Sequence, residues 1–180
     1  MDNQLPEKDV SIQSAIASMR ANRPLRAEET CRDYLHHHPG CTDHLRLLSH
    51  ALMKQNRLQE AEEQLRFALS LDEDFPQLHE DLGSVLAMQS RFKEAVPELE
   101  RAIELQPALP LAHKKLGQIL ATLGRGEEAD EAFQRYIDSD EDRARIVEGI
   151  EILNKGELDS AEKIFQEVLQ RNPDSINALR

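Results

Sequence analysis

The sequence predicts an all-α protein, a solenoid built from tandem helix-turn-helix repeats. The main observation is a pattern of small and apolar residues that recurs about every 34 residues. Composition supports it, because the hydrophobic residues, 39% of the chain, are mostly Leu, Ala and Ile, whereas aromatic residues make up 4% and Trp is absent. A chain of 180 residues therefore reads as one repeat array, which grows by adding units.

The clearest copy of the repeat is the segment from Pro76 to Leu109. Shifting it by one period in either direction reproduces its pattern, and the fourth copy is about two residues shorter at the end of its second helix or in the turn that follows. The predicted organisation is an N-terminal tail at 1–7, repeats at 8–41, 42–75, 76–109, 110–141 (shortened) and 142–175, and the start of a further helix at 176–180.

Two columns of small residues explain the repeat physically. Paired helices lie about 8–10 Å apart, so little more than a methyl group fits where they cross. The second helices carry an alanine column, and the first helices carry a matching small column. These columns are Ala27, Ala61, Ala95, Ala129 and Ala161, and Ala15, Ser49, Gly83, Gly117 and Gly149.

Turn and helix-end residues agree with this register. Asn22, Asn56 and Gly124 are expected in the turns inside the pairs, and Asp159 and Asp174 near helix starts, where carboxylates offset the helix dipole. Pro97 is expected within about the first turn of a second helix, where a missing N–H is tolerated.

The spacing of Leu82-Gly83, Leu86, Ala95, Leu99, Ala102 and Pro107 resembles the signature of the tetratricopeptide repeat (TPR) family over essentially the whole chain. The resemblance implies a right-handed superhelix of antiparallel helix pairs. Two family columns depart from the pattern, because the aromatic at the head of the first helix and the tyrosine after it are replaced. The residues there are Ser11, Leu45, His79, His113 and Arg145, and Ser18, Leu52, Leu86, Leu120 and Ile152.

Charge limits the choice of partner. With 34 acidic and 22 basic side chains, the net charge is −12, so the average field repels a phosphate backbone and nucleic acid is excluded as the expected partner. The acidic excess is densest over 126–142, which reads as a solvated outer helix face or, alternatively, an acidic docking patch.

No pattern in the sequence predicts catalysis, a cofactor or a metal site. Phosphate-loop, dinucleotide, zinc-protease and nucleophile-elbow motifs are absent. Consecutive helical residues point about 100° apart, so the run His36–His38 is expected to suit a helix C-terminus, with metal binding as the alternative. Cys31 stands in an apolar core column and Cys41 in a turn. Two cysteines without zinc spacing, no signal-peptide run and no membrane-length apolar stretch favour a reduced, cytoplasmic protein.

The TPR resemblance also implies a binding groove, lined by the first helix of each repeat, that takes a peptide. Its residues here would include Ile12, Ile16, Arg20, Arg46, His50, Lys54, Glu80, Ser84, Lys114 and Gln118. Several are cationic, so an acidic or C-terminal peptide is the expected ligand. The family's clamp for chaperone tails needs Lys and Asn at set positions, and no asparagine is in place.

The leading functional prediction is a protein-interaction scaffold, not an enzyme within these 180 residues. After Pro173 the sequence reads as the opening of another first helix rather than a polar cap, so we expect the natural protein to continue past Arg180. Residues 136–138 and the fifth repeat resemble the TPR leader found ahead of a sulfotransferase domain in some bacterial proteins. That resemblance implies a non-catalytic front region of an enzyme, and self-association through the uncapped last repeat is a third alternative.

Overall fold

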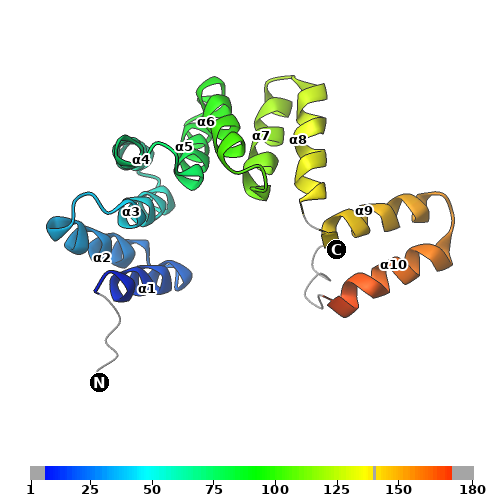
Figure 1. Ribbon diagram of the computed structural model, residues 1–180, viewed down its shortest axis with the longest axis horizontal. Coiled ribbons are helices and arrows are strands. Elements are labelled where there is room, and N and C mark those ends of the chain that lie inside the picture. Colours follow the sequence, from blue (N-terminus) through cyan, green and yellow to red (C-terminus); the bar gives the residue numbers. More distant parts are fainter. Residues whose placement is uncertain (1–6, 140, 172–180) are drawn as a thin grey trace. The chain divides into compact units, whose positions relative to one another are not determined.

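The computed structural model describes residues 7–139 and 141–171, and all regular structure in this part of the chain is helical (Figure 1). The helices are α1 (Glu7–Arg20), α2 (Pro24–His37), α3 (Thr42–Lys54), α4 (Leu58–Leu71), α5 (Pro76–Met88), α6 (Phe92–Leu105), α7 (Pro110–Thr122), α8 (Gly126–Asp138), α9 (Glu141–Asn154) and α10 (Leu158–Arg171). The predicted all-α helical solenoid is confirmed.

The helices belong to two compact units. The first unit, residues 1–107, contains α1 to α6, and the second, residues 108–180, contains α7 to α10. Within each unit every helix packs against the next one along the chain, and the most extensive contact of each unit lies inside a pair, α5 with α6 and α7 with α8. Each unit is therefore a row of helix pairs, coloured blue to green in the first unit and yellow-green to red in the second (Figure 1).

Contacts between alternate helices show which side of the first unit is the inner one. Helix α3 contacts both α1 and α5 directly, whereas no such contact joins α2 with α4, or α4 with α6, among the described residues. Because only the first helices of the pairs approach one another, the first unit curves with α1, α3 and α5 on its inner face.

The turns inside the pairs all use one backbone conformation. The predicted turn residues Asn22, Asn56 and Gly124 have φ values of 54°, 61° and 76°, in the left-handed region that Gly and Asn tolerate best. Ser90 and Gly156 hold the same place in their pairs, with φ values of 62° and 86°. The three predictions are confirmed, and Ser90 is a residue poorly suited to this conformation.

The crossings inside the pairs are as close as the small columns predict. A Cβ atom built on Gly83 would lie 2.7 Å from Cγ of Leu99, and one on Gly117 would lie 2.8 Å from Cε1 of Phe133. The five column alanines are at most 2% exposed. Glycine therefore stands where a large side chain of the partner helix packs directly against the backbone.

One of the predictions about helix ends needs adjustment. Pro97 is the sixth residue of α6, in its second turn, so the expectation of a first-turn position was wrong. The helix continues through this position. Proline has no backbone N–H to donate, but Pro97 is exposed, so the missing hydrogen bond lies on the solvent side. Asp159 is the second residue of α10, as expected near a helix start, and Asp174 lies outside the described residues.

Candidate functional site

The inner face of the first unit carries a three-residue charged network. Arg46 Nε and His50 Nε2, both on α3, each lie 2.7 Å from Oδ2 of Asp81 on α5. Asp81 is only 7% exposed. Burial alone would raise the pKa of Asp81, but the hydrogen bond from His50 and the charges of His50 and Arg46 outweigh it and lower that pKa below its ordinary value.

The other predicted groove residues of this unit lie on α1, α3 and α5, the helices of the inner face. Arg20 and Lys54 are exposed in the last turns of α1 and α3. Glu80 is buried, and Ser84 Oγ donates to its carbonyl oxygen at 2.7 Å. Met88, which takes the place of Lys54 in the next repeat, is 50% exposed. The inner face therefore combines cationic ends with one apolar side chain.

One of the two predicted groove residues of the second unit, Lys114, lies beside an aromatic ring. Lys114 Nζ is 5.6 Å from the ring centroid of Tyr136, and Arg143 Cζ is 4.1 Å from it. Cations at these distances are attracted to the face of the ring. Gln118 is exposed, and its carbonyl oxygen accepts a hydrogen bond from Thr122. Sequence reasoning did not include Tyr136 among the groove residues.

Sequence reasoning also missed that Arg46 and His50 share one carboxylate. Asp81 was not among the predicted groove residues, yet it is the shared acceptor for both Arg46 and His50. The signal that could have identified Asp81 was its position on the first helix of the next repeat, about one period after Arg46. The positive charge of the predicted groove is consequently weaker than a count of its basic residues indicates.

A second network, again absent from the sequence predictions, joins one helix pair to the next. Arg57 Nη1 donates to both carboxylate oxygens of Glu28 at 2.8 Å, and Gln55 Nε2 donates to Glu28 Oε2 at 2.7 Å. Arg32 Nε donates to the same carboxylate at 2.9 Å, and Arg57 also pairs with Glu60. We call this arrangement the inter-repeat ion cluster.

The cluster recurs one period later with the same residue types. Glu62 takes the place of Glu28 and accepts hydrogen bonds from Arg91 at 2.6 Å, Gln89 at 3.1 Å and Arg66 at 2.9 Å, while Arg91 also pairs with Glu94. Burial raises the pKa of Glu62, but hydrogen bonds from Arg66, Arg91 and Gln89 outweigh burial and lower it overall. Both clusters hold adjacent repeats of the first unit in register.

The cysteines differ in surroundings. Cys31 is fully buried, and burial raises the pKa of its thiol to about 12, so it is an inert core residue. Cys41 Sγ lies 3.2 Å from Nδ1 of His44, whose Nε2 lies 3.1 Å from Ser11 Oγ. His44 is fully buried, stacks on Tyr34 with ring centroids 3.9 Å apart, and has its pKa lowered by burial.

The histidine run ends α2 as expected. His36 and His37 contact each other edge-on, and His38 packs on Tyr34 with ring centroids 4.5 Å apart. Over residues 7–139 and 141–171, no group of three or more His, Cys, Asp or Glu side chains is arranged to hold a metal ion. Among the same residues, every helix is too short or too polar to cross a lipid bilayer.

The fold and these sites define a class of protein, a helical-repeat scaffold for protein interactions. Comparison with known proteins gives the family. The tetratricopeptide repeat family matches residues 13–76, 46–110 and 80–144, and the chain belongs to this family. No curated protein sequence is significantly similar to the chain.

Solved structures agree on the fold. MamA from Desulfovibrio magneticus RS-1 is 22% identical, with a TM-score of 0.66 over 93% of this chain and 96% of that one. YrrB, a TPR protein with an unusual peptide-binding site, is 23% identical, with a TM-score of 0.61 over 94% of this chain and 88% of that one. An O-GlcNAc transferase from Thermobaculum terrenum is 26% identical, with a TM-score of 0.59 over 65% of this chain but only 23% of the transferase.

Proposed function

We propose that this TPR scaffold binds an acidic peptide along the inner face of its first unit, across α1, α3 and α5. The observation that carries the proposal is the Arg46–Asp81–His50 network, which joins two of these helices at their inner face. Such a network supports a preorganised binding surface, because its side chains are held before a ligand arrives. Exposed Arg20 and Lys54 flank it.

The side chains of this face indicate the chemistry of the peptide. Asp81 already balances charge on Arg46, so Arg20 and Lys54 supply most of the attraction for acidic residues. Met88 offers an adaptable apolar contact. In the second unit, the exposed residues Lys114, beside Tyr136, and Gln118, one turn further along α7, form a separate candidate contact set. The expected ligand is an acidic peptide with at least one apolar residue.

A displayed peptide library tests this proposal. Random peptides of about 12 residues are selected on the full chain, and binders are then measured by fluorescence anisotropy on the Arg20→Glu/Lys54→Glu variant. We expect selected peptides rich in Asp and Glu, with affinity lowered at least about tenfold by the double variant. The matched control is Arg135→Glu, which reverses an exposed charge in the second unit. Peptides without acidic enrichment, or equal affinity for both proteins, would reject the proposal.

A second candidate function is the non-catalytic front region of a larger enzyme. The observation that favours it is the likeness to the O-GlcNAc transferase, of which this chain matches less than a quarter. Reading the coding DNA beyond codon 180 tests it. An open frame that leads into a catalytic domain, such as a sulfotransferase-like domain with a phosphate-binding loop, supports this function, and a stop codon at that point rejects it.

A further inference from the structure

One face of α1 is exposed where the equivalent faces of α3 and α5 are buried. Val10 is 53% exposed, whereas His44 and Leu78, one and two periods later, are fully buried. Ser14 and Ala17 are likewise exposed, and their equivalents in α3 and α5 are buried. Those equivalents are Leu48, Ala51, Leu82 and Val85, and the preceding helix pair covers them. We call the exposed α1 face, with the adjoining start of α2, the N-terminal end face.

Two arginines at the N-terminal end face occupy the positions of the inter-repeat ion cluster. Arg23 stands one period before Arg57, and Arg26 stands one period before Glu60. Arg57 binds the glutamate of the preceding helix pair, and Glu60 balances part of its charge. Because Arg26 stands where the later repeat has Glu60, this face carries two positive charges in place of a balanced pair. No ion pair to Arg23 or Arg26 occurs among the described residues.

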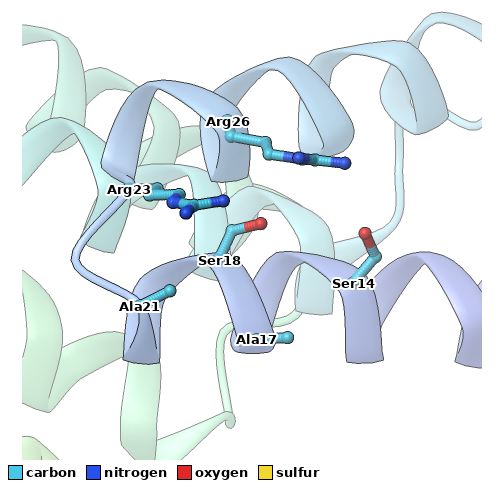
Figure 2. A pocket seen from close by; sticks show the side chains of 6 residues that line it. All are labelled: Ser14, Ala17, Ser18, Ala21, Arg23 and Arg26. Atoms are coloured by element: carbon cyan, nitrogen blue, oxygen red, sulfur yellow. The ribbon is translucent and has the colours of Figure 1, made fainter.

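These side chains surround a pocket of about 290 Å³ between α1 and α2. Figure 2 shows the two guanidinium groups on one side, with the hydroxyl groups of Ser14 and Ser18 directed toward them. Guanidinium and hydroxyl groups are donors that suit a carboxylate. The pocket therefore offers guanidinium donors, as does the site where Arg57 holds Glu28.

An apolar residue beside the arginines indicates that the carboxylate comes from a protein. Leu25 is 65% exposed in the first turn of α2. Its equivalents in the later repeats are all polar or charged, namely Gln59, Lys93, Glu127 and Asp159. Val10 is another exposed apolar residue of the N-terminal end face. A small soluble anion would make no use of these apolar side chains.

We propose that the N-terminal end face binds an amphipathic α-helix of a partner protein, and that a glutamate of this helix pairs with Arg23 and Arg26. The chain itself contains two examples of this binding mode, Glu28 on Arg57 and Glu62 on Arg91. In both examples the glutamate follows a column alanine of a second helix. Ser14 and Ala17 are smaller than most of their equivalents, which leaves room for larger apolar residues of the partner helix.

A helical peptide with the sequence of α4, residues 58–71, is the probe for this site. A hydrocarbon bridge between positions 59 and 63, both exposed in α4, holds it helical without touching Glu62. We expect fluorescence anisotropy to show binding to the full chain. The Arg23→Gln protein, or the probe carrying Glu62→Gln, should weaken that binding at least about tenfold. The control protein Arg135→Gln and the groove variant Lys54→Glu should bind as the parent chain does, so this result is independent of the peptide groove.

Each other outcome overturns the proposal. Absence of binding, or equal binding by the Arg23→Gln protein, shows that the end face is not a helix site. Concentration-dependent dimerisation in light scattering that Arg23→Gln abolishes shows that the occupant is a second copy of this chain. Probe affinity that rises about tenfold in an Asp2→Asn protein shows that residues 1–6 of the chain itself occupy the site. Circular dichroism on every variant establishes that it is folded.

Discussion

Arg57 and Glu28 lie 2.8 Å apart, although they belong to different helix pairs. Glu28 is 8% exposed, and its equivalent Glu62 is 4% exposed, so both carboxylates are largely removed from water. A buried carboxylate is costly unless its oxygens are hydrogen-bonded, and here each accepts bonds from two arginines and one glutamine. The register between neighbouring repeats therefore depends on specific polar contacts as well as on apolar packing.

Stability should depend on pH through Glu62. Its pKa is lowered from an ordinary value of 4.5 in the folded state, so its contribution is present above about pH 4.5 and is lost as pH falls through the folded-state pKa. Glu62→Gln should lower the free energy of unfolding by about 1–3 kcal/mol at pH 7, and by less at pH 3.

Urea denaturation followed by circular dichroism between pH 7 and pH 3 measures this dependence. The control is Glu63→Gln, which changes an exposed neighbour on the same helix. If Glu62→Gln and the parent chain lose stability equally on acidification, the ionised form of Glu62 does not stabilise the fold.

Gly117→Ala should destabilise the second unit despite the better helix propensity of alanine. The added methyl group would lie 2.8 Å from Cε1 of Phe133, and the strain should outweigh a propensity gain of about 1 kcal/mol, for a net loss of about 1–2 kcal/mol. Phe133→Leu removes the ring that causes the clash. The double variant should therefore be more stable than the sum of the single changes indicates, as measured by a thermal-denaturation mutant cycle. Additive effects would contradict direct contact at this crossing.

Ser90→Gly should stabilise the protein. Ser90 has a φ of 62° in a turn where the other pairs use Asn or Gly, and glycine adopts that conformation without steric cost. We expect a gain of about 0.5–1 kcal/mol in the free energy of unfolding. The control is Ser70→Gly in α4, where the helical backbone makes the same replacement destabilising. A loss of stability in Ser90→Gly would show that its side chain contributes more than the turn strain costs.

Asp81→Asn should strengthen binding of an acidic peptide at the inner face. The substitution leaves the charge of Arg46 unbalanced and keeps a side-chain oxygen that can accept its hydrogen bond. Affinity for a library-selected acidic peptide should rise about threefold to tenfold, while stability falls by about 1–2 kcal/mol. Anisotropy titration and urea denaturation measure the two effects separately. Weaker peptide binding by the folded variant would mean that Asp81 itself contacts the ligand.

The order and type of the helices follow from local sequence patterns. Each helix pair needs an apolar stripe at helical spacing, a turn residue that tolerates a positive φ, and small residues at the crossing, and all three occur within one repeat period. The close crossing at Gly83 could therefore be predicted from the two columns, although the side chain that packs against it, Leu99, belongs to neither column. The start of α6 was predicted too late, and Pro97 was therefore expected in the first turn instead of the second, because the sequence signals of helix ends are weak.

The candidate sites depended on distances that no local pattern contains. The predicted groove residues Arg46 and His50 share one acceptor, Asp81, and Arg57 reaches Glu28 across a repeat boundary. The sequence by itself determined the helices, their pairing and the small crossing columns, because these arise from contacts within one repeat. Only the tertiary structure decided which charges are neutralised and which face of α1 stays exposed, because these depend on how whole helix pairs stack on one another.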